Sequence, residues 1–188
     1  GFALASLILI GPVMIAAAIA IKVSSRGPIL YRGLRTGRYG KPFYIIKFRS
    51  MVVDADQGFD TTSKNDPRVT SIGRVLRKSK FDELPQLINV LKGEMSFVGP
   101  RPELPRYTDQ YKGKERLILN VLPGITDYSS LHFSNLNELI DDDDPDDNFE
   151  TKILNEKNCL RIKYVESRSF IVDMILILKT ILRVFRLI

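Results

Sequence analysis

Apolar residues gather at the two ends of the chain, and the spacing of charge among them differs between the ends. Residues 2–21 form a run of 20 without a single charge. As a helix, such a run rises roughly 30 Å, which is the thickness of the hydrocarbon core of a bilayer. Gly11-Pro12 lies at its middle, where proline removes a backbone donor and bends or breaks a helix. Residues 1–22 are therefore predicted to form a membrane helix, either kinked and spanning or broken at Gly11-Pro12 and re-entrant.

The stretch 169–188 is also apolar, but charges interrupt it at regular intervals. Lys179, Arg183 and Arg186 fall at i, i+4 and i+7, which places them on one face of a helix. A helix with this pattern is suited to the membrane interface, with its basic stripe toward headgroups and its apolar side toward acyl chains. A helix that docks on the core of the domain fits the same spacing.

Between these ends the pattern changes to short strands and short helices. Residues 28–32 and 42–48 are aromatic and β-branched, and the glycines between them predict a β-hairpin. Helical spacing follows over 71–78 and again over 84–91, where Gly93 is a natural terminator. The predicted fold class is α+β and mostly helical, with no internal repeat and with residues 23–188 forming one domain after the membrane helix.

Composition narrows the class of protein. The chain has 188 residues, of which 44% are hydrophobic and 27% charged, so it can bury a core. This balance excludes a polytopic membrane bundle and a disordered polyelectrolyte. The single cysteine, Cys159, and the single histidine, His132, cannot supply an internal disulfide or a zinc cage. Any metal must be held by carboxylates, which favours Mg²⁺.

Charge is distributed unevenly along the chain. Residues 22–101 carry a net charge of +9, whereas residues 138–150 hold eight acidic side chains and no basic one. By the positive-inside rule, the basic segment after the first helix lies on the cytoplasmic side, where it also attracts anionic headgroups. The acidic run 141–147 is most simply a solvated loop, with a calcium site as the alternative. Nucleic-acid binding is disfavoured because no binding motif accompanies the basic charge and the apolar run needs a membrane.

The window 81–93 carries the most chemical information. Asp82 and Glu83 are adjacent carboxylates in a basic setting, and a helix begins close to Pro85. One interpretation is structural, with Asp82 as the N-cap of that helix. The other is chemical: paired carboxylates hold Mg²⁺, and a carboxylate attacks phosphorus as a covalent nucleophile while Arg and Lys neutralise the phosphate charge.

Two further clusters carry cations. Pro100 and Pro102 fix the backbone on both sides of Arg101, as a bidentate phosphate clamp requires, although a plain rigid loop has the same sequence. In Lys47-Phe48-Arg49 the alternation of a strand puts both cations on one side, which a solvated strand face also explains.

In this order, the segments resemble the bacterial sugar transferase family, the monotopic polyprenyl-phosphate phosphoglycosyl transferases. Each motif is weak alone, but the ordered set covers most of the chain. The matching segments are Gly11-Pro12, Ser25-Arg26-Gly27-Pro28, Gly40-Lys41-Pro42-Phe43, Lys47-Phe48-Arg49-Ser50-Met51, Asp82-Glu83-Leu84-Pro85-Gln86-Leu87, Met95-Ser96-Phe97-Val98-Gly99-Pro100-Arg101-Pro102, Pro123-Gly124-Ile125-Thr126, and Ser169-Phe170-Ile171-Val172-Asp173 leading to Lys179-Thr180.

The resemblance implies a mechanism. Asp82 would attack the β-phosphate of a UDP-sugar, releasing UMP and leaving a phosphosugar on the aspartate. Polyprenyl phosphate, usually undecaprenyl phosphate, would then accept the phosphosugar and so start a lipid-linked glycan. Glu83 would assist with Mg²⁺ and with proton transfer. The implied phosphate-binding and substrate-binding residues are Lys47, Arg49, Arg77, Pro100, Arg101, Pro102 and, from the C-terminal helix, Asp173.

The resemblance also implies a topology. The first helix would be re-entrant at Pro12, so that a monotopic protein sits on the cytoplasmic face of the bacterial inner membrane. Amphipathic interfacial helices would contact membrane lipids around a cytoplasmic active site, and the chain resembles the minimal catalytic form of the family.

Two departures from the family pattern stand out. Asp127-Tyr128 follow Thr126 where the family commonly has glycine and an aromatic residue, which puts the nucleotide or sugar contact of that loop in question. Gly11-Pro12 stands where Ser-Pro is usual. The contrasting hypothesis is a non-catalytic peripheral scaffold that binds anionic lipid through its basic surface.

Overall fold

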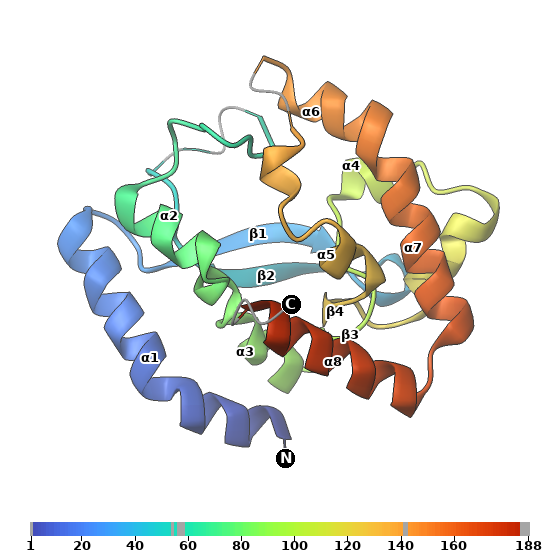
Figure 1. The fold of residues 1–188 in the computed structure, drawn as a ribbon, viewed down its shortest axis with the longest axis horizontal. Helices are drawn as coiled ribbons and strands as arrows, with labels where there is room; N and C mark the ends of the chain where they lie inside the picture. Colours follow the sequence, from blue (N-terminus) through green and yellow to red (C-terminus); the bar gives the residue numbers. More distant parts are fainter. Residues whose placement is uncertain (1, 54, 56–58, 141–142, 185–188) are drawn as a thin grey trace.

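The structure is a computed structural model that describes residues 2–53, 55, 59–140 and 143–184. A long N-terminal helix lies along one side, and the rest of the chain combines a β-hairpin with mostly short helices (Figure 1). The helices are α1 (Phe2–Ser24), α2 (Ser71–Lys78), α3 (Gln86–Leu91), α4 (Pro105–Thr108), α5 (Tyr128–His132), α6 (Pro145–Asn148), α7 (Leu154–Ser167) and α8 (Phe170–Val184). The strands are β1 (Leu30–Thr36), β2 (Pro42–Phe48), β3 (Ser96–Val98) and β4 (Gly124–Thr126). Shorter or irregular helical segments are η1 (Arg38–Gly40), η3 (Phe81–Glu83), η4 (Gly113–Asn120), η5 (Leu136–Glu138) and η6 (Phe149–Ile153). The prediction of a mostly helical α+β fold is confirmed.

Helix α1 is continuous with Pro12 inside it, so the break predicted at Gly11-Pro12 is not an interruption of the helix. Figure 1 shows instead that the helix bends, with its two halves running in different directions. Proline explains the bend, because its ring removes one helical hydrogen bond and crowds the preceding turn.

Helix α1 is partly docked on the domain. Ala17 and Ile21 are buried against Phe48 of β2 and Leu76 of α2. Other apolar side chains along the helix are exposed, among them Leu9, at 82%. By length and composition, Ala3–Ser24 is able to cross a membrane, and little of it is buried in the protein. One side of the helix therefore contacts the domain, and most of its apolar surface has no cover among the described residues.

The predicted β-hairpin is confirmed. Strands β1 and β2 pair antiparallel, with Leu30 opposite Phe48 and Thr36 opposite Pro42. Both faces of β2 are covered: Phe43 and Ile45 on one face pack against Met95, whereas Phe48 on the other face packs against α1 and α2. The backbone N–H of Thr36 donates to the carbonyl of Glu103 at 2.9 Å, so the end of β1 holds the loop that contains Arg101.

Both predicted helices in the middle of the chain are confirmed. Thr70 caps α2, its hydroxyl accepting from the N–H of Gly73 at 2.9 Å. A Cβ on Gly73 would lie 1.9 Å from the carbonyl oxygen of Ser50, so glycine is required where α2 crosses this segment. Helix α3 starts at Gln86, two residues later than predicted, and Gly93 follows it with a φ of +74°, as expected of a terminating glycine.

Strands β3 and β4 were not predicted as strands. They pair in parallel, with Ser96 opposite Gly124 and Val98 opposite Thr126, and bring together two segments that the sequence suggested only as motifs. Gly99 and Gly124 touch backbone to backbone, and a Cβ on Gly124 would lie 2.1 Å from the nitrogen of Gly99. The pair therefore fixes where the loop carrying Arg101 starts.

Helix α8 docks on this small sheet by one face only. Leu176 is 1% exposed, and the hydroxyls of Thr180 and Thr126 share a hydrogen bond of 2.6 Å. On the other side, Phe170 is 78% and Ile171 69% exposed. The prediction that this segment docks on the domain is therefore confirmed for the face that carries Leu176. The opposite face is apolar and exposed, and its place at a membrane interface stays a prediction.

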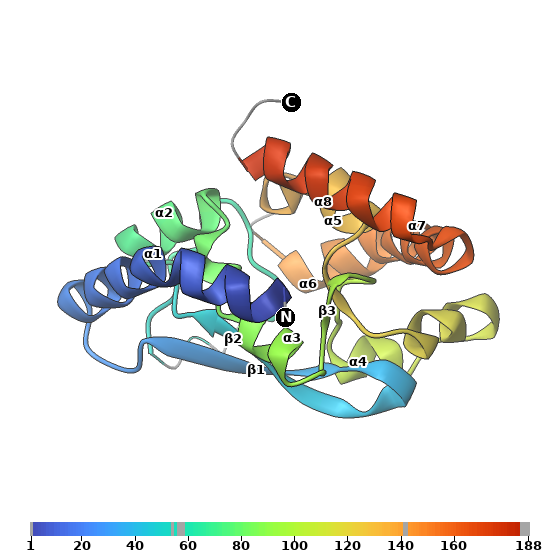
Figure 2. The ribbon, with the colours of Figure 1, turned by 90° about the horizontal axis from the view of Figure 1, so that it is seen from below.

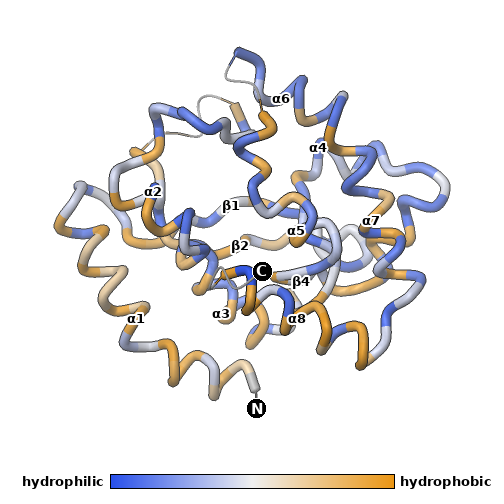
Figure 3. Tube along the Cα trace, viewed as in Figure 1, coloured by the Kyte–Doolittle hydropathy of each residue, from blue (hydrophilic) through white to orange (hydrophobic). Residues whose placement is uncertain are grey.

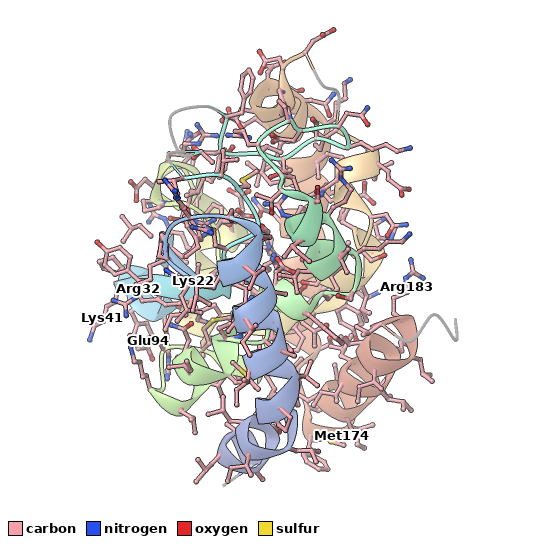
Figure 4. The ribbon with its side chains drawn as sticks, turned by 90° about the vertical axis from the view of Figure 1, so that its left-hand side faces the viewer. Lys22, Arg32, Lys41, Glu94, Met174 and Arg183 are labelled. Carbon is pink, nitrogen blue, oxygen red and sulfur yellow. The ribbon has the colours of Figure 1, made fainter. Side chains whose placement is uncertain are left out.

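The views of the whole molecule place these apolar surfaces. Figure 2 shows α8 and the β1–β2 hairpin on opposite sides of the domain, and Figure 3 shows apolar residues along both α1 and α8. In Figure 4, Met174 of α8 and one end of α1 both lie in the lower part of the view, while Lys22, Arg32 and Lys41 lie on the left. Arg183 donates to the hydroxyl of Ser134 at 2.8 Å, and Arg186 lies outside the described residues.

The acidic segment is more structured than a solvated loop. Asp141 and Asp142 lie outside the described residues, but Asp144 caps α6 and Asp146 accepts from the N–H groups of Asp60 (3.1 Å) and Thr61 (2.8 Å). Asp146 also pairs with Arg106 at 3.2 Å. The expectation of a simple solvated loop is wrong for this part, because Asp146 ties α6 to the segment before α2.

Candidate active site

Asp82 and Glu83 lie in the connection between α2 and α3. Lys80 adopts a left-handed backbone with a φ of +59°, which turns the chain after α2, and η3 then places both carboxylates in a 3₁₀ turn. The prediction that Asp82 caps the following helix is wrong, because Pro85 occupies the N-cap position and η3 comes between. Asp82 is only 7% exposed, and its Oδ1 has no hydrogen-bond partner among the described residues.

Glu83 is fully engaged by two cations. Lys47 of β2 donates to Oε1 at 2.9 Å, and Arg101 binds both carboxylate oxygens, with its Nη1 3.0 Å from Oε2. Such a bidentate pair is the strongest geometry available to arginine and carboxylate. Glu83 therefore brings together two cations that lie far apart in the sequence.

The environment separates the two carboxylates electrostatically. Burial and the neighbouring charge of Glu83 raise the pKa of Asp82. Burial by itself would also raise the pKa of Glu83, but Arg101 and Lys47 outweigh it and hold that pKa well below its usual range. Burial lowers the pKa of Lys47, against the opposing effect of Glu83. Adjacent acids with pKa values driven apart are typical of sites where the two have different tasks.

Two more cations face Asp82. The charges of Arg77 and Lys80, like that of Lys47, act to lower the pKa of Asp82. Arg77 is held by a hydrogen bond from its Nε to the hydroxyl of Ser50 (2.8 Å), and Lys80 donates to the carbonyl of Ser134 (3.0 Å). Arg77 was predicted here. Lys80 was not named as a site residue, although its place two residues before Asp82 in a basic run was a visible signal.

The loop of Arg101 is rigid, as its sequence predicted. Pro100 is fully buried and Pro102 is buried, and the carbonyl of Pro100 accepts from the N–H of Gly124 at 3.0 Å. Arg101 between them is directed to Glu83. The structure thus brings five of the implied site residues together, and their roles in catalysis and phosphate binding stay predictions: Lys47, Arg77, Asp82, Glu83 and Arg101.

Arg49 lies away from this cluster. Its guanidinium donates to the carbonyls of Arg26 (2.8 Å) and Ser25 (3.0 Å), just after the end of α1. Gly27, with a φ of +121°, leaves the space that Arg49 fills, since a Cβ there would lie 2.0 Å from Nη1. The alternation that placed Lys47 and Arg49 on one side ends with β2 at Phe48, so the two cations reach different partners.

Asp173 also lies apart from Asp82. It accepts a hydrogen bond from the hydroxyl of Tyr164 at 2.9 Å, at the start of α8. Together with Arg38 and Arg168 it lines a shallow cavity of about 270 Å³ beside β3. Its assignment to substrate binding stays a prediction.

A second buried ion cluster surrounds Glu103, two residues after Arg101, and no local sequence pattern indicated it. Glu103 accepts from Lys157 at 3.1 Å and from Arg161, both on α7. Lys157 and Arg161 lie 54 and 58 residues further along the chain, too far for any local pattern to reveal the contact. Burial lowers the pKa of Lys157 to about 8, against the opposing charge of Glu103.

The departure at Asp127 has a structural explanation. Asp127 is fully buried and caps α5, its Oδ1 accepting from the N–H of Ser130 at 2.7 Å and from the hydroxyl of Ser129 at 2.9 Å. A carboxylate here satisfies free N–H groups at the start of a helix. Asp127 therefore has a structural role at α5, and the two cations that bind Glu83 come from Lys47 and Arg101.

Of the two carboxylates, Asp82 is suited to bind Mg²⁺ and Glu83 is less suited. Among the described residues, no group of three or more His, Cys, Asp or Glu side chains is placed to hold a metal. Mg²⁺ needs only one or two carboxylates when substrate phosphates complete its shell, and the unpartnered Oδ1 of Asp82 is such a donor. Glu83 fits less well, since both of its oxygens already bind cations.

A buried carboxylate pair ringed by cations is typical of enzymes that act on phosphate groups, and the neighbouring apolar helix is long enough to cross a membrane. The chain belongs to the bacterial sugar transferase family, whose sequence model matches residues 1–187. The predicted family is thereby confirmed, and with it the prediction of an enzyme at the level of the family.

Three relatives illustrate the similarity. The UDP-glucose:undecaprenyl-phosphate glucose-1-phosphate transferase of Escherichia coli (strain K12) is 46% identical over 130 residues, covering 67% of this chain and 28% of that protein. The undecaprenyl-phosphate glucose phosphotransferase of Komagataeibacter xylinus is 38% identical over 189 residues, covering 94% and 33%. The UDP-N-acetylgalactosamine-undecaprenyl-phosphate N-acetylgalactosaminephosphotransferase of Aeromonas hydrophila is 46% identical over 104 residues, covering 55% and 25%. The chain spans a third or less of the length of these relatives.

Proposed function

We propose that this chain transfers a phosphosugar from a UDP-sugar to polyprenyl phosphate through a covalent intermediate on Asp82. The observation that carries the proposal is the state of Asp82: a buried carboxylate, unpartnered at Oδ1, that faces the charges of Lys47, Arg77 and Lys80. Cations around an unengaged carboxylate suit a nucleophile that attacks a diphosphate.

The proposed reaction consists of two successive displacements at the β-phosphorus of the UDP-sugar. An oxygen of Asp82 forms a bond to the β-phosphorus of the UDP-sugar, the bond to the bridging oxygen breaks, and UMP leaves with the electron pair. An oxygen of polyprenyl phosphate then bonds to the same phosphorus, and the bond to Asp82 breaks. The products are the polyprenyl-diphospho-sugar and the free carboxylate, and neither step requires a general acid on Glu83.

The neighbouring residues have separate roles in this proposal. Glu83 positions Lys47 and Arg101, and its low pKa favours this role over proton transfer. Arg77 and Lys80 neutralise the negative charge of the phosphates. A Mg²⁺ ion held by Asp82 and the substrate phosphates would supply further charge neutralisation.

The membrane arrangement is part of the proposal. The first half of α1 and the exposed face of α8, with Phe170 and Ile171, enter the lipid from the same side, consistent with their positions in the lower half of Figures 1 and 4. The bend at Pro12 turns α1 back toward the face it entered, so the protein is monotopic on the cytoplasmic face of the inner membrane.

Trapping the intermediate tests the reaction. The protein is incubated with UDP-glucose or UDP-N-acetylgalactosamine, each radiolabelled in the sugar and without acceptor, and then quenched. We expect label on the protein, UMP in solution, and loss of both in Asp82→Asn. Asp109→Asn, which changes an exposed aspartate, is the matched control. Lipid binding without UMP release from any UDP-sugar would support the peripheral scaffold instead.

A further inference from the structure

Gln86 is the first residue of α3 and one of the most deeply buried side chains of the molecule. It has no exposed surface, and neither its Nε2 nor its Oε1 has a hydrogen-bond partner among the described residues. A buried amide normally finds partners, because leaving its donor and acceptor unpaired away from water is costly. Because neither atom is paired within the structure, the expected partner is a hydrogen-bonding group close to Gln86 that is itself unpaired.

A second amide on the same helix shows that this is not a general feature of α3. Asn89 is equally buried, and its Nδ2 donates to the carbonyl of Tyr44 (2.8 Å) and to Glu94 (2.7 Å). Its Oδ1 accepts from the N–H of Ile46 at 3.0 Å. One turn of helix thus contains an amide with every bond made and an amide with none.

The position of Gln86 relates it to Asp82. The backbone stays in the right-handed helical region from η3 into α3, through Leu84 (φ −54°, ψ −36°) and Pro85 (φ −62°, ψ −14°). Residues four apart in such a segment lie on one face, so Asp82 and Gln86 share the buried face. Oδ1 of Asp82 is an unpaired buried acceptor and Nε2 of Gln86 an unpaired buried donor.

Other acceptors nearby are already engaged. Both oxygens of Glu83 bind Lys47 and Arg101. The remaining unpaired buried groups described, such as Arg49 Nε, Ser130 Oγ and Arg161 Nε, lie near the end of α1, on α5 and on α7. Asp82 is the one that shares a helical face with Gln86.

We propose that Gln86 is a positioning residue for the nucleophile: its Nε2 donates to Oδ1 of Asp82 through one bridging water, or after a change of side-chain rotamer from the conformation in the structure. This bond fixes the plane of the carboxylate and leaves the other oxygen to meet phosphorus. The inference deepens the proposed function and rests on Asp82 being the nucleophile.

The kinetic test compares Gln86→Met with the wild-type chain in nanodiscs that contain undecaprenyl phosphate. With UDP-glucose or UDP-N-acetylgalactosamine as donor, we expect kcat for UMP release to fall by about 10- to 100-fold, because a nucleophile that is free to rotate is less often aligned. The KM for the donor should change by less than about threefold. Gln110→Met, in which an exposed glutamine is replaced, should keep wild-type kcat. An unchanged kcat in Gln86→Met with an active wild type overturns the inference.

A thermal-unfolding cycle tests the contact without any need for turnover. It compares the full chain with Gln86→Met, Asp82→Ala and the double variant. If the side chains interact, Gln86→Met lowers the Tm when Asp82 is present and leaves it unchanged or raises it in the Asp82→Ala background. Additive shifts overturn the inference whatever the kinetics. If the wild type releases no UMP from either donor, the proposed function fails on that result, and the cycle alone decides the contact.

Discussion

Glu83 is the residue on which the placement of two cations depends. Its carboxylate binds Lys47 from β2 and Arg101 from the loop after β3, and all three side chains are mostly buried. A buried carboxylate with two partners keeps its charge and fixes theirs. Changing it disturbs three groups at once.

We therefore expect Glu83→Gln to lower kcat/KM for the UDP-sugar by about 100-fold or more and to lower the free energy of unfolding by roughly 3–5 kcal/mol. The physical reason is that Lys47 and Arg101 lose the charge that compensates their burial. UMP release and thermal unfolding measure the two effects. Glu166→Gln, which alters a solvent-exposed ion pair with Lys114, should change neither. Wild-type kinetics in Glu83→Gln would contradict the positioning role.

The close contact at Gly73 leads to a prediction about the free energy of unfolding. A methyl group there would collide with the carbonyl of Ser50, whose hydroxyl holds Arg77. Gly73→Ala should lower the free energy of unfolding by about 1–3 kcal/mol, as expected of overpacking against backbone, despite alanine's better helix propensity. Chemical unfolding in detergent measures it. Gly11→Ala in α1, where the added methyl group meets open space, should be neutral or stabilising.

At the scale of elements, helix α7 holds the loop that contains Arg101 through ion pairs with Glu103. Lys157 and Arg161 both bind Glu103, two residues after Arg101, and all of these groups are buried. Removing one partner from such a cluster leaves charge without compensation. The loop therefore depends on two residues of a helix that lies more than 70 residues after the carboxylate pair in the sequence.

This cluster makes stability depend on pH. Burial lowers the pKa of Lys157 from 10.5 to about 8, so between these values the unfolded chain binds more protons than the folded one. Stability consequently rises with pH across this window, by roughly 3 kcal/mol for a fully expressed shift. Unfolding measured from pH 7.5 to 10 should show this rise in the wild type and less of it in Lys157→Met. Lys114→Met, at an exposed lysine, should keep the wild-type slope, and equal slopes in all three proteins would contradict the assignment.

The exposed apolar face of α8 leads to a prediction about binding to lipid vesicles. Its exposed face includes Phe170 and Ile171, while Leu176 docks on the domain. Ile171→Glu should weaken retention on liposomes of anionic lipid by about tenfold, because a charge would enter the acyl region. Liposome flotation measures retention. Leu139→Glu, at an exposed apolar residue outside α1 and α8, is the control and should float as the wild type does.

At the scale of the whole molecule, cysteine labelling tests whether α1 is re-entrant or spans the membrane. Cysteines placed at Ala5 and Lys22, in a Cys159→Ser background, flank the bend at Pro12. For a re-entrant α1, a membrane-impermeant maleimide added to intact spheroplasts should label neither position, and both should react after lysis. Labelling of one position alone in intact spheroplasts would show that α1 spans the membrane.

The sequence revealed what depends on local pattern. Residue spacing predicted α1, the hairpin and α2. The resemblance to a family implied that Lys47, Arg77 and Arg101 bind phosphate beside Asp82 and Glu83; the structure places them near this pair, and their roles stay predictions. Contacts over long sequence separations were not predictable: the parallel pairing of β3 with β4, and the binding of Glu103 by Lys157 and Arg161. The N-cap assigned to Asp82 was wrong because an intervening 3₁₀ turn does not differ in composition from a helix start.

The distance along the chain between Glu103 and its partners also orders events during synthesis. Lys157 and Arg161 leave the ribosome 54 and 58 residues after Glu103, whereas α1, Asp82 and Glu83 precede it. Because chains fold from the N-terminal side as they are made, the proposed membrane arrangement brings α1 to the bilayer while the loop of Arg101 still lacks Lys157 and Arg161. Under that proposal, a nascent chain is bound to the membrane before the candidate site is complete, and a ribosome that stalls before α7 leaves a membrane-bound chain without Glu103's two partners.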